Sequence, residues 1–326
     1  MTPEPKIELH VHLEGAIRPH TLLQIAERND APLPVTTEEE LSQLYEFRDF
    51  RHFLEVWVMS TNCLRTASDF AQVVVDYAAE AASYGAVYLE AIFSPAERML
   101  RGISGEELFT GYAEGAVQAY EEHGVTIRFT PDLYRTLTDF DVAEQVANLS
   151  VKYADRGIVG LGIGGLEGAS PLTPFARSFD IARDGGLGLV PHAGEAGGPD
   201  SIREALGIDP KRLRHGIRAV EDPDLLAEIV ERGIVLDVCP TSNLRTRVVS
   251  TVAEHPLPAL VAAGALCSIS TDDPAMFNTD LGHEYELAAS LGVSARSAYT
   301  AGLAGVLCDD TTRAKLADIG AQWPHR

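Results

Sequence analysis

Side chains that bind metal ions or move protons are concentrated in four short segments of the chain. In chain order these segments are HVH (10–12), HAGE (192–195), RLRHG (212–216) and STDDP (270–274). Imidazole nitrogens and carboxylate oxygens together form a ligand shell suited to zinc, iron or another first-row ion. The residue types in these segments therefore predict a metal-binding site.

The segments can form one site only if the fold brings them together, and each follows a short apolar run typical of a strand. We expect strands at residues 7–12, 87–93, 127–132, 159–163, 189–192, 213–215, 235–239 and 267–271. Residues i and i+2 of a strand point to the same side, so His10 and His12 should enter the site together. Helical stretches lie between most strands, for example at 68–83, 108–123 and 222–232, and several precede a glycine, as helix C-termini do.

Alternating strands and helices predict the α/β class with a parallel sheet. Eight such units close a (β/α)8 TIM barrel, whereas six or seven would form an open doubly wound sheet. We expect the barrel, as a single domain over residues 1–326, since the chain contains no linker or low-complexity tract. Barrel enzymes build their sites at the C-terminal ends of the strands, and the four segments fall there.

The connection between the first two expected strands is unusually long and contains an aromatic pattern. Phe47, Phe50, Phe53 and Trp57 recur at three- and four-residue spacing, which predicts one face of a helix. We expect this insertion to form a helical lid over the mouth of the barrel. Ordinary core packing is the alternative interpretation, and the two overlap because a lid must also pack against something.

The composition excludes several classes of partner. The chain has 26 Lys and Arg against 48 Asp and Glu, and a surface so acidic repels phosphate backbones and anionic lipid. We therefore expect a small-molecule substrate, with neither nucleic acid nor membrane as partner. Four widely spaced cysteines without a CxxC pair predict reduced thiols, and the absence of a signal-peptide pattern at the N-terminus predicts a cytoplasmic location. Oligomeric state is not predicted.

Each candidate residue alone has a structural interpretation: a lone buried histidine is usually a hydrogen-bonded core residue, and Asp-Asp-Pro is usually a turn or helix cap. Charged groups are seldom buried unless paired or metal-bound, however. Three histidine segments, a glutamate and an aspartate pair, all at expected strand ends, therefore favour a functional site.

Five motifs together resemble the adenosine deaminase family of the amidohydrolase superfamily. They are KIELHVHLEGAIRP, HAGE, RLRHGIRAVED, LDVCPTSNLRT and SISTDDPAMF, and the similarity runs from about Lys6 to about Tyr285. The resemblance implies the (β/α)8 barrel and one catalytic zinc ion per chain. The implied zinc ligands are His10, His12, His192 and Asp272.

The resemblance also implies hydrolytic removal of the 6-amino group of an adenine nucleoside, with release of ammonia. Glu195 would protonate the purine at N1, and His215 would orient and stabilise the attacking hydroxide. Asp273 would hydrogen-bond N7, and the backbone N–H of Gly165 would meet N3. Attack at C6 of an aromatic ring needs charge placed on N1, which the proton from Glu195 provides.

Two positions depart from the family pattern. Adenosine deaminases usually have the sequence HLDGA after the paired histidines, and its aspartate contacts the ribose 5′-hydroxyl, whereas this chain has Glu14 at that position. The second departure is Leu166, which occupies a position where the family often has an acidic residue. We expect the Glu14 carboxylate to face the same mouth as the zinc. Relatives with HLEG resemble enzymes acting on 5′-extended adenosines, which favours 6-amino-6-deoxyfutalosine of menaquinone synthesis over adenosine or deoxyadenosine.

Three alternatives remain. A phosphotriesterase-like binuclear site would need a bridging lysine at the fourth strand, and residues 158–167 contain none. A nucleic-acid base deaminase would combine H-x-E with P-C-x-x-C, a combination that the chain lacks. A catalytically inactive binding protein on the same barrel would be expected to have lost a ligand or the proton donor, and here the set is complete.

Overall fold

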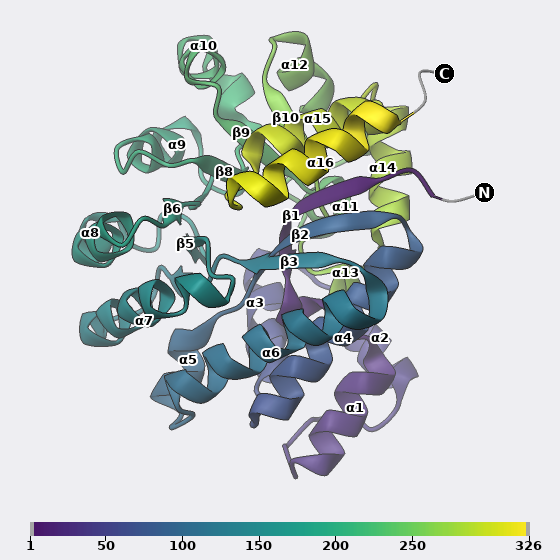
Figure 1. Ribbon diagram of the computed structural model, residues 1–326, viewed down its shortest axis with the longest axis vertical. Coiled ribbons are helices and arrows are strands. Elements are labelled where there is room, and N and C mark those ends of the chain that lie inside the picture. The colour runs from purple at the N-terminus through teal and green to yellow at the C-terminus, as the bar shows by residue number, and fades with distance from the viewer. Residues whose placement is uncertain (1–2, 324–326) are drawn as a thin grey trace.

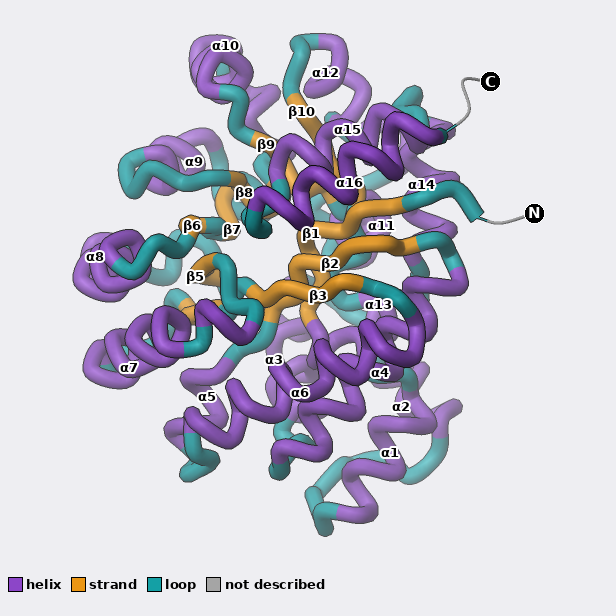
Figure 2. The backbone as a smooth tube through the Cα atoms, viewed as in Figure 1, coloured by secondary structure: helices purple, strands orange, loops and turns teal. Residues whose placement is uncertain are grey.

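The computed structural model describes residues 3–323 and shows central parallel strands surrounded by helices (Figure 1). The strands are β1 (Lys6–His12), β2 (Ala86–Ile92), β3 (Thr126–Phe129), β4 (Asp132–Tyr134), β5 (Gly160–Gly164), β6 (Gly188–Leu189), β7 (His192–Ala193), β8 (Arg212–His215), β9 (Val235–Val238) and β10 (Leu266–Ile269). Helices follow most of the strands and pack around them (Figure 2). The fold is the expected (β/α)8 barrel.

Two of the eight expected strands are each divided in two. The third is divided into β3 and β4 around Pro131, and the fifth into β6 and β7 around Pro191. Proline has no backbone N–H to donate to a ladder, so regular pairing stops beside it. With each divided strand counted once, the barrel has the eight strand positions that the sequence predicts.

Hydrogen bonds between strands distant in sequence close the barrel. The ladders run β1-β2-β3, β4-β5-β6 and β10-β9-β8-β7, and every pair is parallel. The last strand rejoins the first where Asp272 N donates to His10 O at 3.0 Å and His12 N donates to Asp272 O at 2.7 Å. Closure therefore takes place at the residues that the sequence singles out for chemistry.

The helices form where capping signals and apolar faces predict them. They are α1 (Pro19–Arg28), α2 (Glu38–Leu44), α3 (Phe50–Thr61), α4 (Ala67–Ser83), α5 (Pro95–Leu100), α6 (Gly105–His123), α7 (Phe140–Lys152), α8 (Ala176–Asp184), α9 (Pro199–Leu206), α10 (Pro223–Arg232), α11 (Pro240–Arg245), α12 (Leu257–Ala262), α13 (Pro274–Phe277), α14 (Leu281–Ser290), α15 (Ala295–Gly305) and α16 (Asp310–Gln322). The expected helices at 68–83, 108–123 and 222–232 are confirmed as α4, α6 and α10. Gly124 and Gly233 end α6 and α10 in the left-handed region, at φ 73° and 64°.

The aromatic run in the long insertion is only partly helical. α3 begins at Phe50 because the Asp49 side chain accepts a hydrogen bond from His52 N at 2.8 Å and caps the helix. Phe47 precedes this cap, so the prediction that it shares a helical face with Phe53 is wrong. Its ring still packs 5.3 Å from the ring of Phe53, which explains why the aromatic spacing resembles one continuous face.

α15 and α16 cover the N-terminal end of the barrel. Ile7, Leu9 and Tyr88 from β1 and β2 form a buried cluster there with residues of these two helices. A Cβ added at Gly302 of α15 would lie 3.0 Å from the Ile7 side chain, so this glycine lets α15 approach β1 closely. All four cysteines are free and buried, as predicted, and no helix in the described part of the chain is long and apolar enough to cross a membrane.

Candidate active site

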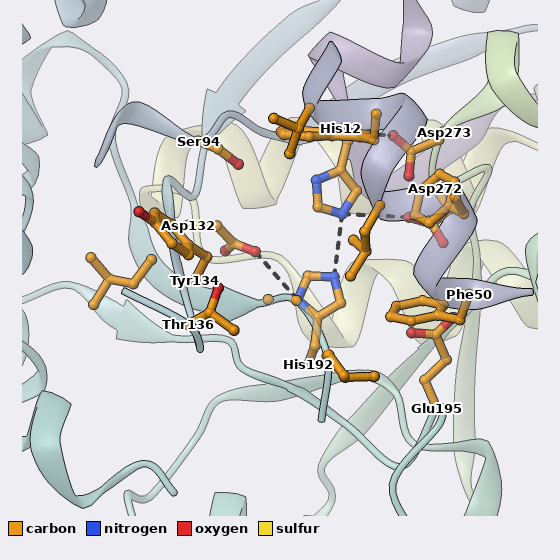
Figure 3. Close-up of a pocket in the computed structure, with 18 of the residues that line it drawn as sticks. His12, Phe50, Ser94, Asp132, Tyr134, Thr136, His192, Glu195, Asp272 and Asp273 are labelled. Atoms are coloured by element: carbon orange, nitrogen blue, oxygen red, sulfur yellow. Dashed lines mark hydrogen bonds and ion pairs between the residues drawn. The ribbon is translucent and has the colours of Figure 1, made fainter. Parts of the chain in front are cut away.

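The barrel brings the predicted metal-binding side chains together at the C-terminal ends of β1, β7 and β10. His12 Nε2 lies 3.2 Å from His192 Nε2. The Oδ1 atom of Asp272 lies 3.3 Å from His10 Nε2 and 3.4 Å from His12 Nε2. His12, His192 and Asp272 converge on one point in Figure 3.

The spacing of these donor atoms fits a single ion. In a tetrahedral site with bonds of about 2.0–2.1 Å, neighbouring ligand atoms are about 3.3 Å apart, close to the separations found here. His10 Nε2 is buried and makes no well-formed hydrogen bond. The carboxylate oxygen beside it, Asp272 Oδ1, is shared with His12 Nε2. The donor set of three imidazoles and one carboxylate therefore fits zinc.

Two further side chains orient these candidate ligands. His192 Nδ1 lies 3.1 Å from Ile163 O and 3.3 Å from Asp132 Oδ2, while the other Asp132 oxygen pairs with buried Arg214. Ser242 Oγ donates to Asp272 Oδ2 at 2.6 Å. Carboxylate and hydroxyl partners of this kind fix the orientation of a metal ligand.

Asp132 belongs to the site but was not predicted from the sequence. It lies outside the motifs, and its only signal is that a carboxylate ends the third expected strand. A Cβ added at Gly162 would lie 2.1 Å from Asp132 Oδ1 and 2.4 Å from Arg214 Nη1. The glycine therefore provides the space in which this buried pair forms.

Two site residues have a backbone conformation that is unusual for side chains. His215 and Asp272 lie in the left-handed region, with φ 61° and 67°. Such conformations cost non-glycine residues about 1–3 kcal/mol and persist where the surrounding structure enforces them. Here they turn both side chains inward at the ends of β8 and β10.

Glu195 and His215 lie beside the candidate metal ligands. His215 Nε2 is 3.5 Å from Glu195 Oε2 and 3.8 Å from Asp272 Oδ2. Burial, together with the charges of Asp272 and Glu167, raises the pKa of Glu195 well above its usual value. The raised pKa favours the protonated form of this carboxyl group.

Glu167 fixes the turn that carries Glu195. It accepts hydrogen bonds from Gly194 N at 2.7 Å, Glu195 N at 2.8 Å and Ala196 N at 3.1 Å. Burial opposes its ionisation, but hydrogen bonds from Ser201 and the backbone lower the pKa of Glu167. Its role was not predicted from the sequence, although it directly follows Leu166, just beyond the end of β5.

A cavity extends from these residues toward α3. One wall is apolar, and Ser94, Tyr134 and Thr136 also line the cavity (Figure 3). Gly165 and Leu166 belong to the lining as well. The residues of the apolar wall come from α3 and are Phe50, Phe53, Leu54, Trp57 and Val58. Asp273 also lines the cavity and accepts a hydrogen bond from Trp57 Nε1 at 2.8 Å.

Glu14 lies at the C-terminal end of the barrel, beside the end of β2, but its carboxylate does not line the cavity. It is 1% exposed, accepts a hydrogen bond from Ser94 N at 2.8 Å, and lies 3.6 Å from Arg98 Nη2. The residues that line the cavity include Ser94 but not Glu14. The Glu14 carboxylate instead binds the β2–α5 connection through Ser94 N.

The protein-family model for adenosine deaminase matches residues 5–319. The chain belongs to the adenosine deaminase family. Within this family it is 54% identical to an aminodeoxyfutalosine deaminase from Acidothermus cellulolyticus, over 98% of this chain and 92% of that protein.

Two solved structures support the same assignment. The structure of an adenine deaminase from Arthrobacter aurescens is 32% identical and has a TM-score of 0.91, covering 98% of this chain and 99% of the other. An amidohydrolase from Burkhoderia ambifaria, solved with bound Zn, is 25% identical with a TM-score of 0.87 over 98% and 90% of the two chains. The adenosine deaminase family thus accounts for the barrel.

Proposed function

We propose that this protein hydrolytically removes the 6-amino group of an adenine nucleoside, releasing ammonia, and that its preferred substrate is 6-amino-6-deoxyfutalosine. The 54% identity to an aminodeoxyfutalosine deaminase, over 98% of the chain, carries the choice of substrate. The reaction type is supported by the complete set of metal-binding and acidic side chains at one barrel end. Adenosine or deoxyadenosine is the alternative substrate.

The proposal includes one zinc ion per chain, held by His10, His12, His192 and Asp272. When bound, zinc lowers the pKa of a coordinated water to about 7 and supplies a nucleophile at neutral pH. Support comes from donor separations of 3.2–3.4 Å and from the buried His10 Nε2, which makes no well-formed hydrogen bond. Purified protein should contain about one zinc per chain, and His192→Ala should lower that content. Two metal ions per chain would contradict this ligand set.

Two carboxyl groups would act on the purine in their protonated forms. Ring nitrogens N1 and N7 are acceptors, so a carboxyl group can bind them only by donating a proton or a hydrogen bond. Glu195 would give its proton to N1, which draws electron density from C6 and prepares it for attack. Burial and the neighbouring Asp272 charge raise the pKa of Asp273 well above its usual value, which suits donation to N7.

The 5′ end of the nucleoside would lie toward the α3 wall. Glu14 is turned toward Ser94 N, so no carboxylate from this position competes for the space that a 5′ extension needs. Phe50, Leu54 and Val58 offer apolar contact to an aromatic extension, and Gly165 would meet N3 through its backbone N–H. The proposed preference thus follows from room and apolar surface at one end of the cavity.

A panel of adenine, adenosine, deoxyadenosine, methylthioadenosine and aminodeoxyfutalosine tests the substrate. We expect kcat/KM to be highest for aminodeoxyfutalosine and lowest for free adenine, which lacks the ribose and the extension. A preference for adenosine would replace the proposed substrate with the alternative. A preference for adenine would contradict both, and would match the activity that the name of the Arthrobacter aurescens relative describes.

A further inference from the structure

A continuous chain of hydrogen bonds connects a backbone amide to the imidazole of His215. Leu257 N donates to His255 Nδ1 at 3.1 Å. His255 Nε2 lies 3.3 Å from Asn243 Oδ1, and Asn243 Nδ2 lies 3.3 Å from His215 Nδ1. All three side chains are buried, so water does not compete for these contacts.

The first link determines the direction of the others. A backbone N–H can only donate, so His255 Nδ1 must carry a lone pair. Burial lowers the pKa of His255 to about 4, and the neutral ring therefore has its proton on Nε2. This N–H must face the amide oxygen of Asn243, which leaves the amide nitrogen to donate to His215 Nδ1.

The last link then fixes the tautomer of His215. Because Nδ1 accepts from Asn243, the proton of the neutral ring is on Nε2. That atom points toward the site, 3.5 Å from Glu195 Oε2 and 3.8 Å from Asp272 Oδ2. The ring thus presents a donor, not a lone pair, to the space between the proton donor and the metal-binding carboxylate.

We propose that His255 and Asn243 are positioning residues that hold His215 as its Nε2–H tautomer, so that His215 donates a hydrogen bond to the attacking oxygen. The inference rests on the proposed function for the identity of that oxygen. The tautomer itself follows from the hydrogen-bond chain alone. His255 lies between η5 (Val252–Glu254) and α12, so a segment on the outside of the barrel sets the protonation of a ring inside it.

Asn243→Asp tests the proposal because it reverses one link without changing size. Aspartate accepts at both oxygens, so it would accept from His255 and draw the His215 proton to Nδ1. A wrong tautomer at a catalytic histidine costs on the order of 10⁴-fold in kcat, and we expect a loss approaching that size. Asn148→Asp, the same substitution at an exposed position of α7, is the matched control and should leave kcat unchanged.

A conservative substitution at His255 should preserve the hydrogen-bond chain. The amide nitrogen of glutamine can take the place of ring Nε2, so His255→Gln should keep kcat within about tenfold of the wild type, about 1.4 kcal/mol. His255→Leu removes the donor to Asn243 and should lower kcat further, while KM changes little. Equal kcat in the glutamine and leucine variants would overturn the role of His255.

Nitrogen NMR of histidine-labelled, zinc-loaded protein reads the tautomer directly, without substrate. The His215 signals are assigned by their loss in His215→Gln. We expect a lone-pair type shift at Nδ1 and an N–H type shift at Nε2, exchanged in Asn243→Asp. A lone-pair shift at Nε2 in the wild type would overturn the proposal. If no compound of the substrate panel is deaminated, the proposed function fails, but the tautomer measured by NMR still tests the role of His255 and Asn243. If Asn243→Asp does not fold, the wild-type spectrum still decides.

Discussion

Trp57 donates its indole N–H to Asp273 Oδ1 across 2.8 Å, and this bond joins α3 to the residue that follows Asp272, at the end of the last barrel strand. Trp57 belongs to the long insertion, and Asp273 belongs to the β10 end that closes the barrel. On the other side, Gly15 leaves room for the same carboxylate, since a Cβ there would lie 1.7 Å from Asp273 Oδ1. The aromatic insertion and the Asp273 carboxyl group are therefore one structural unit.

Trp57→Phe should weaken catalysis while preserving the apolar wall. The variant loses one buried hydrogen bond, which contributes about 0.5–1.5 kcal/mol, so kcat/KM should fall by up to about tenfold. The matched control is Trp323→Phe, at the chain's other tryptophan, which packs on Tyr299 far from the cavity. Equal losses in both variants would show that the Asp273 contact does not matter.

Glu195→Gln should remove the proposed proton donor and leave the structure unchanged. Glutamine keeps the size of the side chain but cannot give a proton to N1. Zinc content and melting temperature should hold, while kcat falls by at least about 10²-fold, the low end of general-acid effects. Turnover near that of the wild type would remove Glu195 from the proton-transfer step.

Asp132→Asn should weaken metal binding without removing a ligand. Loss of an outer partner of a metal-bound histidine costs about 10–100-fold in metal affinity, measured by competition with a chelator. Asp237→Asn is the control, because Asp237 also forms a buried pair, with Arg212 Nε at 2.9 Å, but does not contact a ligand. Both variants should lose stability, and only Asp132→Asn should lose zinc affinity. Equal zinc affinities of Asp132→Asn and Asp237→Asn would contradict the role of Asp132 in orienting His192.

Glu284 should make stability depend on pH. Burial raises its pKa from 4.5 to about 7, although Thr241 and Thr279 donate hydrogen bonds to it. The unfolded chain therefore loses the proton first, and stability falls as pH rises from about 4.5 to about 7, by about 3 kcal/mol. Glu284→Gln should reduce this fall in denaturant titrations, while exposed Glu39→Gln should not. If the stability of Glu284→Gln falls with pH as steeply as that of the wild type, Glu284 is not the group responsible for the fall.

The barrel and the convergence of His10, His12, His192 and Asp272 could be predicted because each signal is local. A strand ending in His10-Val11-His12 specifies its own geometry, and HAGE and STDDP follow apolar runs of strand length. The division of strands at Pro131 and Pro191 was missed, because a short apolar run does not show where its ladder is interrupted. The helix start at Phe50 depended on the Asp49 cap, which aromatic spacing alone conceals.

The contacts between distant segments could not be predicted. Asp132 and Arg214 are separated by 82 positions and meet only when the barrel closes. Glu14 follows two residues after His12, yet its side chain turns away from the cavity. The reason is that Leu13–Ala16 forms a 3-10 turn, so the alternation of side chains along the strand stops at His12.

The most direct test of the central claim is product analysis after turnover of 6-amino-6-deoxyfutalosine in ¹⁸O-labelled water by the zinc-loaded protein. Hydrolytic deamination predicts one ammonia released and one ¹⁸O atom in the product, at C6 of the purine, for each substrate consumed. No turnover of the nucleoside, an unlabelled product, or cleavage that releases the free base would contradict the account.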